Sequence, residues 1–465
     1  MEFHHSGYSC AAGNVFKAKV EDQGALEDFT IPDQDFTFGA VSYTENKDTK
    51  TWYSYDDQGR VTWMRTWYRG LFDEPKTVEY AYDFFGNVTK ISYQAGYASD
   101  QFYHLYTYDA DYRISQVYAS STNIDGDAPP ETNLVATYEY YTHGPLKRVV
   151  FGDDLQGVDY VYTLQGWLKT INNPTGDDPG GDVNDAFAMQ LDYYNGDYLN
   201  PEPSVPFDEQ FNGNIASTNW KTMSQVAGVY NANQYHFTYD DRNQLLGAHN
   251  GQDDAYKVEG LSYDANGNIR SVKRFDSDPM EVLHDFTGAA NSYVYYEGED
   301  SSDPDDVIAT NRLKEVPGYA AYRYDAIGQM TQQIKESSLF MDYDVSGKMT
   351  AVTLESGEED ARFTYDDRGF RMRKEDVTYG RESVYVRDAS GTVLAIYERE
   401  GNNLVKKEVP VYGASRLGTY RTNGQLEYEL KDHLGNVRAT VTLGLSTPKY
   451  AADYYPFGLK RSHDG

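Results

Sequence analysis

The chain has 465 residues and carries 73 acidic against 41 basic side chains, which gives a formal net charge of −32 at pH 7. No basic cluster is dense enough to hold a phosphate backbone against that field, so nucleic acid is not expected as a partner. Cys10 is the only cysteine, which excludes an internal disulfide and any metal site built on several cysteines of this chain.

The first 50 residues are expected to be partly irregular or to hold the first strands. Residues 1–7 have neither a basic nor an apolar region of the kind that opens an export signal. No later run approaches the ~18 apolar residues that a membrane helix requires. We therefore expect neither an export signal nor a membrane span in the segment.

A short unit, Tyr-Asp-x-x-Gly, recurs from residue 55 onward. Its six full copies are Tyr55-Asp56 with Gly59, Tyr82-Asp83 with Gly86, Tyr263-Asp264 with Gly267, Tyr324-Asp325 with Gly328, Tyr343-Asp344 with Gly347, and Tyr365-Asp366 with Gly369. Aspartate can bond its own backbone two residues on, and glycine supplies positive φ at the end of a tight turn. The unit therefore predicts strand, turn, strand.

The residues around the motif tyrosine alternate in polarity. The position two before it is apolar or aromatic, as in Tyr53, Tyr80 and Leu261, whereas small or polar residues such as Ser54 and Ser262 mostly lie between. This period-two pattern predicts strands with one buried face. With 44 tyrosines in the chain, the fold class indicated is all-β, a sheet of consecutive antiparallel hairpins with a tyrosine-rich core.

Residues 51–430 are expected to form this repeat region, with acidic loop insertions near 121–131, 172–185 and 297–306. Such loops can hold a hard cation. An EF-type loop centred on Gly126 fails, because it would place Thr132 where a bidentate glutamate belongs. Solvated surface loops are favoured, and neither a metal nor a cofactor is predicted.

No segment makes a positive case for catalysis. His4 and His5 are the only adjacent histidines, and no His-Glu-x-x-His, nucleophile elbow, phosphate loop or dinucleotide fingerprint occurs. Asp178-Pro179-Gly180-Gly181 fits an Asp-Pro-x-Gly pattern, but it lies in a mid-chain Gly/Asp/Pro loop and is interpreted as coincidence. We expect no enzymatic activity in this segment.

The repeats resemble the YD repeats of rearrangement-hotspot (Rhs) proteins, teneurins and the C components of insecticidal toxin complexes, over roughly residues 50–460. Residues 431–465, with Lys431–Val441 and Asp453–Lys460, look like the truncated start of the Rhs repeat-associated core of the Bacteroidota-type branch. Its signature positions here are Asp432, His433, Gly435, Arg438, Tyr455, Pro456 and Gly458. His433 is interpreted as a packing or turn residue rather than a base.

The resemblance implies a spiralling hairpin sheet, here an incomplete shell, with motif tyrosines in ladders inside its wall. It implies a secreted bacterial toxin protein, extracellular or at the cell surface, whose partners are a C-terminal effector domain or further shell segments. Family members continue past the Pro-Phe-Gly element, so any effector, autoprotease or export signal is expected outside residues 1–465. The alternative is an adhesion module that binds a cell-surface glycan or protein, and an enzyme acting on polysaccharide ranks last.

Overall fold

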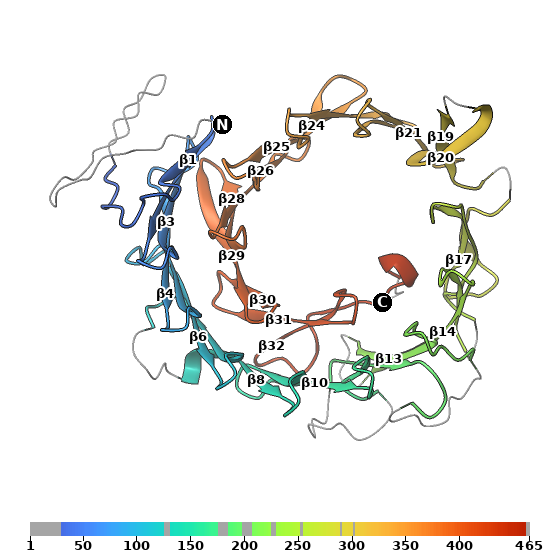
Figure 1. Cartoon of the computed structure of the whole chain (residues 1–465), viewed down its shortest axis with the longest axis horizontal. Coiled ribbons are helices and arrows are strands. Elements are labelled where there is room, and N and C mark those ends of the chain that lie inside the picture. The colour runs from blue at the N-terminus through green and yellow to red at the C-terminus, as the bar shows by residue number, and fades with distance from the viewer. Residues whose placement is uncertain are drawn as a thin grey trace. The chain divides into compact units, whose positions relative to one another are not determined.

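The computed structural model describes residues 29–124, 131–174, 185–197, 207–224, 229–251, 254–288, 291–300 and 303–461. In this part the regular structure consists of 33 strands and two single 3₁₀ turns, η1 (Glu131–Asn133) and η2 (Pro456–Gly458) (Figure 1). The strands form two sheets, one of 18 strands over residues 43–285 and one of 15 strands over residues 294–451, and within each sheet strands that follow one another pair antiparallel. The predicted all-β class of consecutive antiparallel hairpins is confirmed.

The strands of the first half are β1 (Tyr43–Glu45), β2 (Thr49–Tyr55), β3 (Val61–Tyr68), β4 (Lys76–Tyr82), β5 (Val88–Tyr93), β6 (Phe102–Tyr108), β7 (Ile114–Ser120), β8 (Leu134–Tyr140), β9 (Leu146–Phe151), β10 (Gln156–Tyr162), β11 (Leu168–Ile171), β12 (Phe187–Asp192), β13 (Ser217–Met223), β14 (Tyr230–Tyr239), β15 (Leu245–His249), β16 (Val258–Tyr263), β17 (Ile269–Phe275) and β18 (Val282–Asp285).

The second half continues with β19 (Val294–Asp300), β20 (Asp303–Val316), β21 (Ala320–Tyr324), β22 (Met330–Ile334), β23 (Leu339–Tyr343), β24 (Met349–Leu354), β25 (Glu359–Tyr365), β26 (Arg371–Asp376), β27 (Arg381–Arg387), β28 (Val393–Glu400), β29 (Asn403–Tyr412), β30 (Arg416–Arg421), β31 (Leu426–Lys431), β32 (Val437–Thr442) and β33 (Tyr450–Ala451).

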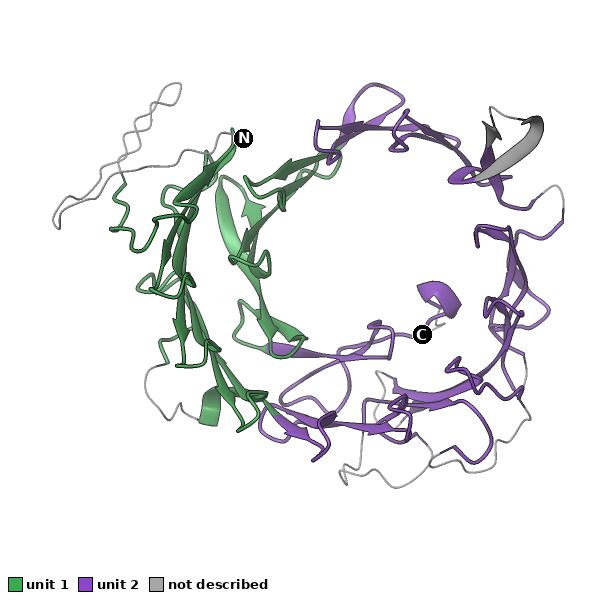
Figure 2. Cartoon of the chain, viewed as in Figure 1, with its two compact units in different colours: residues 1–137, 361–425 green, residues 138–360, 426–465 purple. Residues whose placement is uncertain are grey.

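The chain divides into two compact units. Unit 1 comprises residues 1–137 and 361–425, and unit 2 comprises residues 138–360 and 426–465 (Figure 2). Each unit thus joins an early and a late stretch of the chain. The boundaries near residues 50 and 430 drawn from the sequence stay predictions.

Unit 1 contains two layers of strands. The early layer is β2–β6 and the late layer is β26–β30, and both are drawn in green in Figure 2. The hydroxyls of Tyr93 and Tyr397 lie 2.6 Å apart between the layers. The rings of Phe102 and Tyr420 pack with centroids 5.2 Å apart. The core of unit 1 lies between these layers.

Covering segments correct the one-face pattern predicted for residues 49–55. Ser54 was expected on the open face, yet it is fully buried, because the segment before β1 covers it and the Asp35 amide donates to its hydroxyl at 2.9 Å. Thr49 and Thr51 lie on the opposite face with Tyr53, where the Asp367 carboxylate accepts from their hydroxyls at 2.9 and 3.0 Å. In single-layer hairpins of unit 2 the expected alternation holds, with Arg323 and Asp342 exposed between half-buried neighbours.

Unit 2 is organised around the last described segment of the chain. The ring of Tyr428 stacks on that of Phe151 with centroids 5.0 Å apart. Trp220 of β13 donates its indole N–H to Asp453 at 2.8 Å, and the Tyr455 hydroxyl donates to the Phe275 carbonyl at 2.7 Å. Residues 426–461 therefore form part of the core of unit 2.

Candidate functional sites: repeat turns, terminal signature and groove

The six motif turns share one hydrogen-bonding pattern. In the first, the Asp56 amide donates to the Arg60 carbonyl at 2.9 Å and the Gly59 amide donates to the Asp56 carbonyl at 3.1 Å. The Asp56 carboxylate accepts the backbone N–H groups of Gln58 and Arg60 at 3.0 and 2.9 Å. Gly59 has a φ of 81°, and the glycines of the other five copies also have positive φ. Asp and Gly therefore close the turn through local chemistry.

Sequence reasoning missed the residue that follows the glycine. Its side chain often carries an N–H group that donates to the second oxygen of the motif aspartate. Arg60 donates at 2.6 Å, Asn87 at 2.8 Å and Gln329 at 2.8 Å. The Asn87 amide, with three backbone N–H groups, lowers the pKa of Asp83. A search for Arg, Asn or Gln directly after the motif glycine would have found this signal.

The motif tyrosine ties its hairpin to the previous one. Tyr82 donates its hydroxyl to the Val61 carbonyl at 2.9 Å, Tyr263 to Leu245 at 2.6 Å, and Tyr343 to Met330 at 2.7 Å. The acceptor is each time the first residue of the strand that follows the preceding turn. The rings are half-buried, so burial of the motif tyrosines is partial, and burial raises the pKa of each of these phenols.

The terminal signature contains a seventh turn of the same kind. The Asp432 carboxylate accepts the amides of Leu434 and Asn436, both at 3.0 Å, and Gly435 has a φ of 85°. His433 occupies an inner position of this turn, and burial lowers the pKa of its imidazole. Arg438 donates to Asp432 at 2.8 Å. The signature residues thus build a turn whose carboxylate is locked by a buried arginine.

Asp453 is a central residue of the signature that the sequence did not single out. It is fully buried and accepts from Trp220 at 2.8 Å, from Thr222 at 3.0 Å and from Arg438 at 3.3 Å. Its partners on β13 precede it by more than 200 residues. Buried charges are stable only when paired and hydrogen-bonded, so this carboxylate fixes the signature on β13.

The Tyr455-Pro456-Phe457-Gly458 element forms the 3₁₀ turn η2. The Gly458 amide donates to the Tyr455 carbonyl at 3.0 Å, and Phe457 has a φ of 66°. Arg461, 1% exposed, follows this turn and lies over the ring of Tyr256 at 4.6 Å. Stacking of a guanidinium on aromatic faces is favourable when it is removed from water. The seven signature residues therefore lie in these two turns or beside them: Asp432, Arg438 and Tyr455 are buried, whereas Gly435 and Gly458 are exposed.

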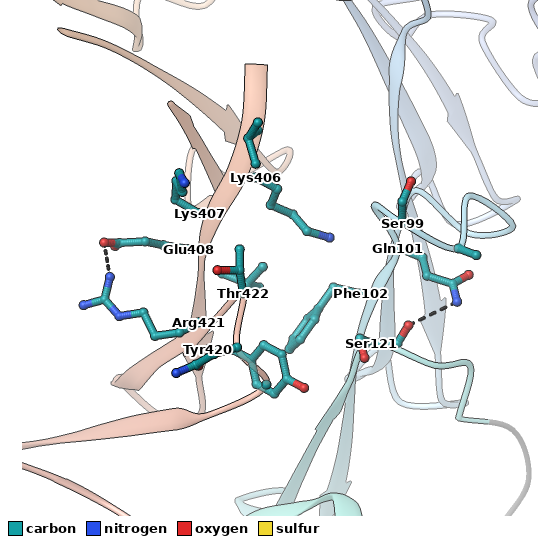
Figure 3. Close-up of a pocket in the computed structure, with 15 residues that line it drawn as sticks. Ser99, Gln101, Phe102, Ser121, Lys406, Lys407, Glu408, Tyr420, Arg421 and Thr422 are labelled. Atoms are coloured by element: carbon teal, nitrogen blue, oxygen red, sulfur yellow. Dashed lines mark hydrogen bonds and ion pairs between the residues drawn. The ribbon is translucent and has the colours of Figure 1, made fainter. Parts of the chain in front are cut away.

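Between its layers unit 1 has a groove of about 520 Å³. Figure 3 shows Gln101 and Phe102 on one side and Lys406, Glu408 and Tyr420 on the other. Glu408 pairs with Arg421, and Lys406 lies 3.7 Å from Asp100. The Gln101 side chain donates to the Ser121 carbonyl at 3.1 Å. The groove therefore combines aromatic rings, amides and hydroxyls with compensated charges.

Asp100 anchors a polar network beside this groove. It accepts from Lys76 at 2.5 Å and from the Tyr397 hydroxyl. Burial alone would raise the pKa of Asp100, but Lys76, the Tyr397 hydroxyl and Lys406 together outweigh burial and the pKa is lowered. Burial raises the pKa of Tyr397 far above its ordinary value. A phenol held protonated and a carboxylate held ionised form a structural link between the layers.

Several predicted features fall outside the described residues. Asp178-Pro179-Gly180-Gly181, His4, His5, Cys10 and most of the acidic loops at 121–131 and 172–185 belong to them. In the part that is described, no three histidine, cysteine or acidic side chains gather where they would hold a metal ion. The same part contains no helix of the length and apolarity needed to cross a membrane.

No family model and no curated protein sequence matches the chain. Solved structures do match. A crystal structure of TcdB2-TccC3 without its hypervariable C-terminal region has a TM-score of 0.60 at 13% identity, covering 91% of this chain and 21% of that one. The crystal structure of TcdB2-TccC3 has a TM-score of 0.60 at 14% identity and covers 91% of this chain and 21% of that one. A Tc holotoxin pore of Photorhabdus luminescens with a substitution in TccC3 has a TM-score of 0.60 at 14% identity and covers 91% of this chain and 20% of that one.

These likenesses show the fold. Each covers nearly all of the chain at an identity too low to carry function. The chain spans about a fifth of the length of the chains that it matches. Its structural neighbours are thus segments of toxin-complex proteins, in agreement with the coarser part of the resemblance drawn from the repeats.

Proposed function

We propose that the chain is a structural segment of an Rhs-type YD-repeat shell, which encloses or displays a C-terminal effector of a secreted bacterial toxin protein. The observation that carries the proposal is the fold likeness to TcdB2-TccC3 over 91% of the chain. Tyrosine hydroxyls that tie one hairpin to the next support it, because a long wall needs a local, repeatable link.

The role proposed for the segment is mechanical rather than catalytic. Its buried carboxylates Asp367 and Asp453 accept hydroxyl donors from strands far away in the chain, and Asp432 accepts amides of its own turn and the Arg438 guanidinium. A catalytic carboxylate needs a face open to substrate, and these three are at most 6% exposed. The proposed partners are the effector and further shell segments, and the proposed location is outside the cell or on its surface.

Limited proteolysis of the natural full-length gene product tests the proposal. We expect the sequence downstream of residue 465 to encode a domain that is cut slowly while joined to the intact segment. The same domain, expressed alone, serves as the control and should be cut rapidly. Equal cleavage rates in both forms would argue against enclosure.

The groove of unit 1 favours one competing role, an adhesion module that binds a cell-surface glycan. Its half-buried ring Tyr420, supported by the buried Phe102 and lying beside the Gln101 amide, is of a type that contacts sugars. Binding of the purified chain to a glycan array, lost in Tyr420→Ala, would support that role. An array without signal would remove this alternative.

A further inference from the structure

A second pocket of unit 1 lies on strands β26–β30 and has a volume of about 370 Å³. Three arginines line it: Arg371, Arg387 and Arg416. Tyr385 and Tyr412 are the aromatic residues of its wall. We call it the arginine pocket. It is separate from the groove of Figure 3, since the two have no lining residue in common.

The arginine pocket opens on the face of the late layer that points away from the early layer. Tyr385 pairs with Ile396, and Val384 pairs with Tyr397, so the two pairs point to opposite faces. Tyr397 bonds Tyr93 of the early layer and is buried, as is Val384. Tyr385 and Ile396, on the other face, are half-buried. The pocket therefore faces away from the packed core of unit 1.

The late stretch of unit 1, residues 361–425, has a net charge opposite in sign to that of the whole chain. Residues 361–425 contain nine arginines and three lysines against nine acidic side chains, a net charge of +3, while the whole chain carries −32. Within the described residues, neither Arg371 nor Arg387 has a carboxylate oxygen within salt-bridge distance, in contrast to Arg373 and Arg399, which pair with Glu382. The positive charges of Arg371 and Arg387 are thus not paired with a carboxylate of the described residues.

Backbone carbonyls hold Arg387 in a fixed orientation. Its guanidinium donates to the Gly391 carbonyl at 2.8 Å and, through two nitrogens, to the Arg371 carbonyl at 3.3 and 3.2 Å. A guanidinium has five N–H groups, so two remain for a ligand. Burial lowers the pKa of Arg387, and the attraction of the nearby Asp366 carboxylate, which raises it, is the smaller effect. An anion in the pocket would further favour the charged guanidinium.

We propose that the arginine pocket binds an acidic peptide segment, with a glutamate or aspartate carboxylate held by Arg371 and Arg387. Guanidinium groups suit planar oxyanions because they present parallel N–H donors. Val393, Ile396 and Pro410 add apolar wall area, which a bare inorganic anion would leave uncovered. A peptide that alternates acidic and apolar side chains matches both features. The inference stands apart from the proposed shell role.

Titration calorimetry with the complete chain tests this site. The probe is an end-capped Glu-Leu-Glu-Leu-Glu peptide, and its glutamine counterpart is the ligand control. We expect Arg387→Met and Arg371→Met each to weaken binding about tenfold, the loss of roughly one charge-assisted contact. Arg362→Met removes the same charge outside the pocket and should leave binding unchanged. Because Arg371 is exposed and makes no such carbonyl bonds through its side chain, its variant tests the site even if Arg387→Met fails to fold.

Three results would overturn the proposal. Equal binding of the glutamate and glutamine peptides would remove the carboxylate from recognition. An Arg371→Met protein that binds as well as the parent would place the peptide elsewhere. Sodium phosphate that binds as tightly as the peptide, with the same sensitivity to Arg371→Met, would make the pocket an inorganic anion site instead.

Discussion

Strand β2 of unit 1 and strands β21–β23 of unit 2 are built on the same turn motif, yet they differ in burial. In Thr49–Tyr55 five of the seven side chains are buried, whereas none is buried in Met330–Ile334 or Leu339–Tyr343. The turns are equivalent, because Asp56 and Asp344 each accept the amides two and four residues on. The motif therefore makes the hairpin, whereas a second layer makes the core.

The largest effect is expected where the second layer meets the first. Asp367→Ala should lower the free energy of unfolding by about 4 kcal/mol, since it strips the buried hydroxyls of Thr49 and Thr51 of their charged acceptor. Urea unfolding followed by tryptophan fluorescence measures it, because Trp52 and Trp67 are buried in unit 1. Val345 occupies the same motif position in a single-layer hairpin, and Val345→Ala should change little. Similar losses in both variants would contradict the comparison.

Acid should weaken the two-layer region through His104. Burial lowers the pKa of His104 to about 4, from 6.5 for the exposed imidazole. The unfolded chain then binds a proton that the folded chain does not, so stability falls as the pH drops from about 6.5 to about 4. The parent should lose about 3 kcal/mol more over this range than His104→Gln, which keeps an N–H donor for the Pro410 carbonyl. Urea unfolding at a series of pH values measures this loss, and an equal fall in the free energy of unfolding in the parent and in His104→Gln would refute the role of His104.

Two glycines with the same turn geometry differ in what surrounds them. A Cβ at Gly391 of unit 1 would lie 2.3 Å from the Phe370 ring, whereas one at Gly328 of unit 2 would meet nothing within 4 Å. Both have positive φ. We expect Gly328→Ala to cost about 1 kcal/mol from the backbone alone, and Gly391→Ala about 2 kcal/mol. Thermal unfolding of the two variants compares them, and an equal fall in melting temperature in both would mean that the Phe370 ring moves aside freely.

The smallest effect tests what the regions share. Tyr82→Phe and Tyr343→Phe each remove one hydroxyl bond to a backbone carbonyl, at 2.9 and 2.7 Å. Both should cost about 1 kcal/mol, because the link belongs to the hairpin ribbon and not to the second layer. A large loss in Tyr82→Phe and none in Tyr343→Phe would instead place the tyrosine link in the core of unit 1.

The local part of the fold was predictable from the sequence. Tyr-Asp-x-x-Gly contains its own acceptors, donors and positive-φ residue within five positions, so each turn forms without reference to the rest of the chain. The donors that follow the glycine, such as Asn87 and Gln329, also belong to the repeat, but they were not recognised from the sequence. Period-two alternation then predicted the strands on either side.

The long-range part was not predictable. Asp367 meets Thr49 across 318 positions, and Asp453 meets Trp220 across 233. Nothing local distinguishes these carboxylates from the other acidic residues of a strongly acidic chain. The same holds for the arginine pocket, whose arginines lie on strands β26, β27 and β30 and converge only when the late layer has formed.

Amide hydrogen exchange, read by mass spectrometry on the intact chain, tests most directly the claim that a shared hairpin ribbon gains its core from a second layer. Peptides from Thr49–Tyr55 and Arg381–Arg387 should exchange slowest. Peptides from Met330–Ile334 and Leu339–Tyr343 should exchange faster, yet more slowly than an unstructured chain, because their ladders are formed and lie open to water. Equally slow exchange in both regions, or exchange at the unstructured rate in the second, would contradict the account.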